Sequence, residues 1–306
     1  MRTVVTGATG FVGRWLVNEL IKQNDKVTII VRNKKKILPE WKGIVEVIEA
    51  ELEQLSHLSA EDFSDGCADI FFHFAWTGTS GQERADVNLQ LKNVQFTCDA
   101  VQLAGQLKCK RFVNAGSIME YEAVQFILRD AAKPGMGNIY SIAKLTADFM
   151  AKTVAVKIQI DYINVIISNI YGSGEYSSRF INTTLRKMLN NEDIPLSPGT
   201  QLYDFIYVTD AVKAIVFVGK KGEQESSYYI GNSNQRLLKE YVTEMKQVLK
   251  SESNLLFGEV PFKGARLTYE EFDTKKLEKL GFVPEVSFTE GIRLTRNWIL
   301  EGNNEY

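Results

Sequence analysis

The sequence predicts an α/β fold, in which a Rossmann-like doubly wound parallel sheet is followed by a smaller C-terminal α/β substrate lobe. Three observations support this prediction. Short β-branched runs alternate with helical patterns through residues 1–174. Three glycines follow the first run at a regular spacing of three. After Gly174 the alternation becomes irregular, as expected for an appended lobe.

The first elements form a βαβ unit. A β-branched run at 2–6 predicts a buried strand, a glycine turn follows it, and 11–23 has apolar residues at helical spacing. The next strand is expected at 26–31, which requires a parallel sheet. The alternation continues with strands at 44–48, 70–74, 111–115 and 162–168, and with helices at 84–107 and 139–156.

The second half has weaker patterns. They predict helices at 178–191, 208–217, 236–251 and 273–280 and a strand at 228–230. We expect residues 1–174 to form the dinucleotide-binding domain, with the chain returning to it around 201–231. Residues 175–306 then form the substrate lobe, over the carboxyl ends of the strands, where such sheets bind ligands.

Composition excludes several classes of protein. The 306 residues carry a net charge of −2, so no basic field favours nucleic acid. No apolar stretch reaches the length of a membrane span, and the first residues do not resemble a signal peptide. The 3 cysteines and 2 histidines form no metal-ligand spacing, and we expect His73 to be a buried strand residue. We therefore expect a cytoplasmic protein without a metal.

The glycine turn predicts a phosphate site. Gly7 permits a tight turn, Gly10 lets the backbone approach a pyrophosphate, and Gly13 lets the helix pack closely on the sheet. The helix N-terminus then offers N–H donors and a positive dipole to the phosphates. The expected cofactor contacts in this turn are Gly7, Thr9, Gly10, Phe11, Val12 and Gly13.

The end of the second strand indicates which dinucleotide binds. An enzyme that uses NAD usually has an acidic residue there, which binds the ribose 2′-hydroxyl. Here the strand ends Val31-Arg32-Asn33 and a run of lysines follows. Because Arg32 can form a bidentate pair with a 2′-phosphate, the sequence favours NADP(H) and leaves NAD(H) possible. The alternative is that Arg32 stacks on the adenine or faces solvent.

Tyr140 and Lys144 form a candidate proton-transfer pair. Residues four apart share one face of a helix. A phenol is a poor proton donor or acceptor at neutral pH, and a nearby ammonium favours its phenolate. With 12 tyrosines in the chain the spacing can arise by chance, so the alternative is an exposed pair on a surface helix.

Together these residues resemble the extended short-chain dehydrogenase/reductase family, the nucleotide-sugar epimerases, dehydratases and reductases. The resemblance covers nearly the whole chain. It rests on the glycine turn, on Tyr140-x-x-x-Lys144 and on the strand end Asn114-Ala115-Gly116-Ser117. Further matches are Glu51-Leu52, Asn88, Asn169-Ile170-Tyr171-Gly172, the segment 204–210 and the C-terminal segments 273–277 and 280–282.

The resemblance implies a role for each matched residue. Tyr140 is the acid/base, Lys144 lowers the pKa of its phenol and holds the nicotinamide ribose, and Ser117 hydrogen-bonds the reacting oxygen. Glu51, Leu52 and Asn88 are implied cofactor contacts, and Asn169 lies near the substrate diphosphate. The chemistry agrees, because a carbonyl becoming an alkoxide needs a proton and a donor aimed at its oxygen.

Two departures from the family narrow the reaction. The 4,6-dehydratases carry Asp-Glu after the catalytic Ser/Thr, where this chain has Ile118 and Met119, so we reject a dehydratase. The family usually has an arginine for the substrate diphosphate where this chain has Tyr203. Either Arg179 or Arg266 holds the diphosphate, or the substrate is not a nucleotide sugar. For both arginines, a plain surface charge is the alternative.

The function we predict is an NADPH-dependent reductase of a nucleotide-linked 4-keto-6-deoxy sugar. The alternatives are a nucleotide-sugar 4-epimerase and a non-catalytic dinucleotide sensor. By resemblance we also expect a homodimer, formed by the helices near 88–107 and 140–156. The identity of the sugar and of its nucleotide depends on the lobe after residue 174.

Overall fold

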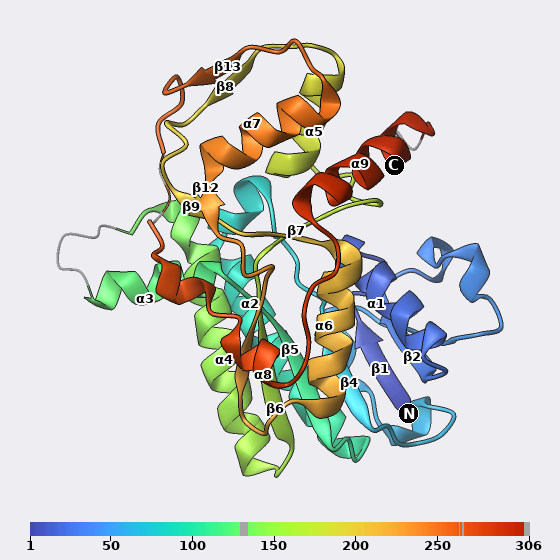
Figure 1. The fold of residues 1–306 in the computed structure, drawn as a ribbon. Helices are drawn as coiled ribbons and strands as arrows, with labels where there is room; N and C mark the ends of the chain where they lie inside the picture. The colour runs from blue at the N-terminus through green and yellow to red at the C-terminus, as the bar shows by residue number, and fades with distance from the viewer. Residues whose placement is uncertain (129–133, 263, 265, 303–306) are drawn as a thin grey trace. The chain divides into compact units, whose positions relative to one another are not determined.

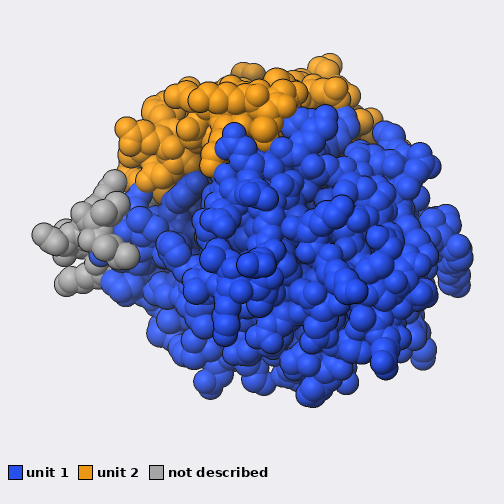
Figure 2. All heavy atoms as spheres, turned by 90° about the horizontal axis from the view of Figure 1, so that it is seen from below, with its two compact units in different colours: residues 1–167, 212–229 blue, residues 168–211, 230–306 orange. Residues whose placement is uncertain are grey.

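The structure is a computed structural model that describes residues 1–128, 134–262, 264 and 266–302. The chain forms two compact units, coloured separately in Figure 2. The first contains residues 1–167 and 212–229, and the second contains residues 168–211 and 230–306. In the described parts of the chain, none of the helices has both the length and the apolar character that crossing a bilayer requires.

A seven-stranded sheet forms the centre of the first unit (Figure 1). Its order is β11-β6-β5-β4-β1-β2-β3. The strands are β1 (Arg2–Thr6), β2 (Lys26–Val31), β3 (Glu46–Glu49), β4 (Ile70–His73), β5 (Arg111–Ser117), β6 (Asp161–Ile167) and β11 (Ser227–Ile230). β1 pairs with β2 on one side and with β4 on the other, both in parallel. This confirms the predicted sheet and places its switch point between β1 and β4.

Both faces of the sheet are buried, which explains the near-continuous apolar runs in the sequence. Because side chains alternate along a strand, each cross-strand row of residues faces one side. One row, buried on the side of α6 (Val208–Lys221), is Ile29, Val5, Phe72, Val113 and Ile163. Gly219 of α6 lies against the Phe72 ring, where a Cβ would come within 2.8 Å of it.

The opposite face packs against α2 (Val87–Gln106) and α4 (Ile139–Lys157). The cross-strand row on this face is Val4, Phe71, Phe112 and Tyr162. The Phe112 ring stacks on the rings of Phe71 and Tyr162. In α4 the buried residues Ala147, Ala151 and Ala155 recur every fourth position, so the helix lies close to the sheet. Figure 1 shows α1 (Phe11–Lys22) and α6 on the other side of the sheet from α2 and α4.

The second unit contains helices and pairs of short strands. Its helices are α5 (Phe180–Leu189), α7 (Leu238–Leu249), α8 (Lys275–Lys279) and α9 (Phe288–Leu300). β7 (Asn169–Tyr171) pairs with β10 (Phe205–Tyr207), β9 (Leu202–Tyr203) with β12 (Arg236–Leu237), and β8 (Ile194–Leu196) with β13 (Leu255–Phe257). Rings of Tyr171, Phe205, Tyr241 and Phe288 form the aromatic part of its core.

Several elements differ from the sequence prediction. The helix expected from 84 begins at Val87, because Asp86 caps it by accepting the Leu89 N–H, and Gly81–Ala85 is a separate 3-10 turn. The sequence predicted neither α9 nor α3 (Met119–Leu128), which follows β5 directly. It also missed the paired strands of two or three residues in the second unit, since such strands are too short to show a period.

Candidate active site

The glycine turn is pressed against the carboxyl end of β4. Gly7 has φ of +75°, and a Cβ there would lie 2.5 Å from the backbone of Phe74. At Gly13 a Cβ would lie 2.0 Å from the Gly7 carbonyl oxygen. Both positions therefore require glycine. Gly10 is exposed, and a Cβ there would meet only the Gly7 oxygen, so backbone is open to a ligand at this point.

Helix α1 starts directly after this turn. Gly10 occupies the capping position, and no side chain of the described residues caps the first turn. The first N–H groups of a helix lack partners within the helix and favour an anion. The Arg14 side chain donates to the Thr9 carbonyl and fixes the turn, while Thr9, Phe11 and Val12 lie half-buried around it. The turn therefore fits the phosphates of a dinucleotide.

Arg32 comes directly after β2 and is exposed. The acid of the neighbouring strand end, Glu49, accepts the Lys34 backbone N–H at 2.9 Å. The Lys34 ammonium also lies 4.0 Å from Glu49. Glu49, the register partner of Val31, is thus already bound by Lys34, whereas Arg32 is exposed to solvent.

The remaining predicted cofactor residues lie farther along the first unit. Glu51 is exposed at the start of the 3-10 helix Leu52–His57, and Leu52 packs on the core. Asn88 is exposed in the first turn of α2. Asn93, which the sequence reasoning missed, is buried and holds the backbone of Thr77 through both the N–H and the carbonyl. The signal for Asn93 was a polar residue on the buried face of α2.

A buried polar row crosses the carboxyl ends of the central strands. The register places Thr6, His73, Asn114 and Asn164 side by side on the face toward α2 and α4. Thr6 hydrogen-bonds His73 at 2.9 Å, and Asn114 donates to Asn164 at 2.9 Å. Burial lowers the pKa of His73 to about 3, so the ring is neutral. The prediction that His73 is a satisfied buried residue is confirmed.

Ser117 ends β5. Its hydroxyl oxygen accepts the Met119 N–H at 3.2 Å, so the hydroxyl proton can still be donated. Its backbone N–H donates to Glu120 at 2.7 Å, and Asn164 donates to the same carboxylate at 3.1 Å. Neither Glu120 nor Asn164 was predicted from the sequence to belong to the site. The available signals were an acid three residues after Ser117 and an asparagine within a β-branched strand.

Tyr140 and Lys144 are both buried in α4, which excludes the alternative of an exposed surface pair. The Lys144 ammonium donates to the Ala115 carbonyl at 2.8 Å and lies 3.7 Å from the centre of the Trp76 ring. The Trp76 ring meets Tyr140 edge-on, at 6.1 Å between ring centroids. The Arg84 guanidinium lies 4.5 Å from the centre of the Tyr140 ring. The pair thus sits in an aromatic and cationic environment.

The charge on Lys144 depends on its surroundings. Complete burial lowers the pKa of its ammonium, and the Coulombic attraction of Glu120 opposes this shift.

In the described residues no group of His, Cys, Asp and Glu side chains could hold a metal ion, and the cysteines are free thiols.

Apart from Ser117, which lies in the first unit, the predicted substrate residues lie in the second unit. Asn169, in β7, donates to the Asp204 carbonyl at 3.2 Å. Tyr203, in β9, stacks on Phe205. Arg179 precedes α5, is half exposed and lies 3.7 Å from Glu175.

Two further arginines of this unit are candidates to replace the arginine that the family usually has where this chain has Tyr203. Arg266 is exposed and reaches Thr200 at 3.3 Å. Arg236, which the sequence analysis did not single out, pairs directly opposite Tyr203 across β9 and β12. Its guanidinium is fixed by an ion pair with Glu244 at 2.6 Å and lies over the Tyr241 ring.

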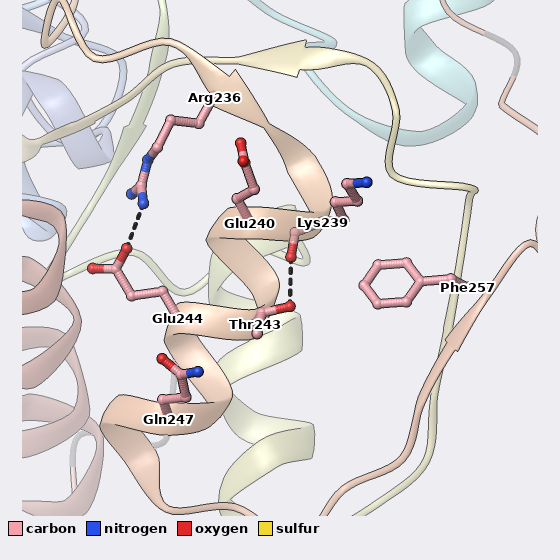
Figure 3. Close-up of a pocket in the computed structure, with 7 residues that line it drawn as sticks. All are labelled: Arg236, Lys239, Glu240, Thr243, Glu244, Gln247 and Phe257. Carbon is pink, nitrogen blue, oxygen red and sulfur yellow. Dashed lines mark hydrogen bonds and ion pairs between the residues drawn. The ribbon is translucent and has the colours of Figure 1, made fainter.

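A cavity of about 530 Å³ lies along α7 (Figure 3). Two of its side chains are cationic, Arg236 and Lys239, and two are acidic, Glu240 and Glu244. The charges balance, and Figure 3 shows Arg236 turned to Glu244. The cavity therefore lacks the net positive charge that would attract a diphosphate.

Comparisons with known proteins agree with this geometry. A family model described as "NAD dependent epimerase/dehydratase family" matches residues 3–231. CDP-abequose synthase of Salmonella muenchen is 26% identical over 298 residues, covering 95% of this chain and 96% of that protein.

Two solved structures share the fold over nearly the whole chain. UDP-glucose 4-epimerase of Thermotoga maritima with UDP-glucose has a TM-score of 0.79 and 19% identity, covering 99% of this chain and 100% of the other. The Bordetella bronchiseptica enzyme WbmF in complex with NAD+ has a TM-score of 0.76 and 19% identity, covering 99% and 93%. Both were solved with a ligand that contains a nucleotide.

Proposed function

The chain belongs to the NAD-dependent epimerase/dehydratase family, and we propose that it is an NADPH-dependent reductase of a nucleotide-linked 4-keto-6-deoxy sugar. The relative named as a synthase of CDP-abequose supports a nucleotide-linked sugar as substrate. The observation that carries the choice of reductase is Arg32, exposed at the end of β2 where an acid would favour NAD. Net reduction in cells draws on NADPH, whereas an epimerase returns its hydride and retains its cofactor.

Three side chains of the first unit perform the proton chemistry. When bound, the nicotinamide supplies a hydride to the keto carbon. As the C=O π bond breaks, Tyr140 gives its proton to the oxygen, which becomes the new hydroxyl. Ser117 donates a hydrogen bond to the same oxygen, and the Lys144 ammonium stabilises the phenolate left on Tyr140. Solvent then returns a proton to Tyr140, so atoms and charge balance.

The direct test is a reduction assay. Purified protein is incubated with NADPH and a 4-keto-6-deoxy nucleotide sugar, and absorbance is followed at about 340 nm, where reduced nicotinamide absorbs. We expect stoichiometric loss of absorbance and formation of the 4-hydroxy sugar. No loss of absorbance, together with inversion at C4 of a stable nucleotide sugar, would identify an epimerase and contradict the proposal.

Dehydration is not part of the proposal. The two positions after Ser117 that would carry an acid and a base are Ile118 and Met119, and Ile118 is buried. Neither side chain transfers protons. A non-catalytic sensor remains an outcome of the assay, in which the protein would bind dinucleotide and turn over neither class of sugar.

We propose that the preference for NADP(H) depends on Arg32. Charge-assisted hydrogen bonds contribute about 1.5–3 kcal/mol, so Arg32→Ala should weaken NADPH binding by about 10- to 150-fold and leave NADH binding nearly unchanged. Fluorescence titration with each reduced dinucleotide measures both affinities. Lys36→Ala, an exposed cation in the same segment, is the matched control. Equal loss of affinity for the two dinucleotides would refute the role of Arg32.

For the substrate diphosphate we propose Asn169, Arg179 and Arg266, with Tyr203 beside them. Arg179 and Arg266 are exposed. Arg179 lies 3.7 Å from Glu175, and Arg266 reaches Thr200 at 3.3 Å and lies 5.9 Å from the centre of the Phe262 ring. Either can therefore turn toward a diphosphate. Arg236 is less suited, because Glu244 and an aromatic ring already hold its guanidinium.

We also propose that the protein is a homodimer formed through α2 and α4. Ile142, Phe149 and Val156 recur every seven residues along α4 and are 41%, 63% and 50% exposed. Leu91 of α2 adds an apolar side chain that is 58% exposed. Exposed apolar residues gathered on one face favour association with another surface. A second copy of the same helix pair offers a matching apolar surface.

A charge placed on this face should separate the subunits. We expect light scattering to report a dimer for the unmodified protein at micromolar concentration and a monomer for Phe149→Glu, because a buried unpaired carboxylate is costly. Val283→Glu, at an apolar residue of the second unit that is 66% exposed, should remain dimeric. An unmodified protein that is monomeric would refute the dimer.

A further inference from the structure

One buried acid of the first unit has no part in the proton chemistry described above. Glu120, the second residue of α3, is 2% exposed. Its two carboxylate oxygens accept from the Ser117 N–H at 2.7 Å and from the Asn164 side chain at 3.1 Å. A buried carboxylate is costly unless hydrogen bonds and an opposite charge compensate for its lost hydration. Its position therefore calls for an explanation.

The strands are shaped around this carboxylate. At Gly116 a Cβ would lie 2.8 Å from Glu120 Oε1 and 2.6 Å from Asn164 Oδ1, so these two side chains fill the space of the missing side chain. Asn114 in turn donates to Asn164 at 2.9 Å. Asn164 is thereby oriented with its amide group toward Glu120. Glycine at 116 and asparagines at 114 and 164 together make a site for one carboxylate beside Ser117.

Lys144 reaches the same strand end from α4. Its ammonium donates to the Ala115 carbonyl, two residues before the N–H that Glu120 accepts. Other groups that face the two charges are Asp148 on α4, Tyr162 on β6 and the neutral His73 on β4. Trp76 covers the ammonium with its ring. Of these groups, Glu120 is the acid whose attraction acts on Lys144.

The charges of the two groups support each other. Burial raises the pKa of Glu120, as does the nearby Asp148, while Lys144 and the two hydrogen bonds lower it. Burial lowers the pKa of Lys144, and Glu120 opposes that shift. Each ion therefore favours the charged form of the other. If the acid were removed, the buried lysine would keep the desolvation penalty and lose its opposing charge.

We propose that Glu120 is a positioning residue of the active site, which fixes the strand end that carries Ser117 and supplies a negative charge that favours the ammonium form of buried Lys144. Only the catalytic roles of Ser117 and Lys144 rest on the proposed function. A neutral lysine would not stabilise the phenolate of Tyr140. Glu120 thus acts on the reaction through its neighbours, without contact with the reacting atoms.

The test is the titration of Lys144, which needs neither cofactor nor sugar. The full-length protein is labelled with [ε-13C]lysine, and the Lys144 resonance is assigned by comparison with Lys144→Met. In Glu120→Gln, which keeps the shape of the side chain and removes its charge, the midpoint of Lys144 should fall by about one pH unit or more. A midpoint equal to that of the unmodified protein would overturn the proposal.

Glu122→Gln is the matched control. Glu122 is also a buried acid of α3, two residues from Glu120, whereas the attraction that raises the pKa of Lys144 comes from Glu120. We expect its replacement to leave the Lys144 midpoint where it is. An equal fall in both variants would mean that any loss of acid from α3 moves the midpoint, and would also overturn the proposal.

A measurement on the unmodified protein covers the case in which Glu120→Gln does not fold. With glutamate labelled at the side-chain carboxyl, the Glu120 and Lys144 resonances should change at shared midpoints, because interacting groups titrate as a pair. Independent midpoints would refute the coupling.

The effect on turnover has a defined direction. Lys144 is charged below its pKa, so a lower pKa in Glu120→Gln moves the alkaline limb of the kcat profile to lower pH and leaves KM nearly unchanged. A uniform fall of kcat at every pH would indicate a purely structural role and would count against the proposal. If the protein reduced no sugar, the proposed function would fail, and the lysine titration would still decide the role of Glu120.

Discussion

Replacing Tyr140 with phenylalanine should lower kcat by about 10²- to 10⁴-fold, the usual contribution of a positioned acid or base. The substitution removes one hydroxyl and keeps the ring, so the contacts with Trp76 and Arg84 persist. Dinucleotide affinity should therefore change little. Steady-state turnover and fluorescence titration of NADPH measure the two quantities separately.

Tyr269→Phe is the control for this substitution. Tyr269 is 64% exposed in the second unit, and loss of its hydroxyl should leave turnover unchanged. If Tyr140→Phe kept all measurable activity, the assignment of the reaction to this site would be wrong. A variant that lost dinucleotide binding and turnover together would instead point to a structural role of the hydroxyl.

Gly13→Ala should abolish tight dinucleotide binding. The new Cβ would lie 2.0 Å from the Gly7 carbonyl oxygen, so the turn must open and its N–H groups must leave their positions. Overpacking of this kind costs about 1–3 kcal/mol, and the affinity for NADPH should fall by about 5- to 150-fold. Fluorescence titration gives the affinity, and thermal unfolding reports the accompanying loss of stability.

Gly105→Ala is the control for Gly13→Ala, because it also replaces a glycine within a helix by alanine. Gly105 lies in α2, and a Cβ there would lie 3.0 Å from the end of the Ile158 side chain and 3.6 Å from that of Ile160, both of them flexible side-chain ends. Alanine favours helix more than glycine does, so this variant should bind NADPH normally and be at least as stable. If Gly13→Ala bound NADPH within threefold of the unmodified protein, the phosphate site would not lie at this turn.

The sheet could be predicted because its strands are buried on both faces. Strands β1 and β2 begin and end where their β-branched runs do, because strands buried on both faces are nearly continuous apolar runs. The prediction for β3 was less accurate. It placed the start of the strand at Ile44, which is 57% exposed, whereas β3 begins at Glu46. The paired strands of the second unit have only two or three residues each and gave no comparable signal.

The candidate site was predicted only in part, for physical reasons. The glycine turn has a steric requirement that is visible in the sequence, and the pair Tyr140 and Lys144 has a helical spacing. Glu120 carried no such signal, because an acid is expected at the surface unless its partners are known. Those partners, Ser117 and Asn164, come from β5 and β6 and meet Glu120 only in the fold. The pairing of Arg236 with Tyr203 depends in the same way on strand register.

The most direct measurement of the central claim follows the hydride itself. The protein is incubated with NADPH carrying deuterium at both hydrogen positions of nicotinamide C4 and with a 4-keto-6-deoxy nucleotide sugar. The account predicts a product with one deuterium at C4 of the sugar and an equal amount of oxidised cofactor. No deuterium in the sugar and no oxidation of NADPH, together with inversion at C4 when a stable nucleotide sugar is supplied instead of the keto sugar, would contradict it.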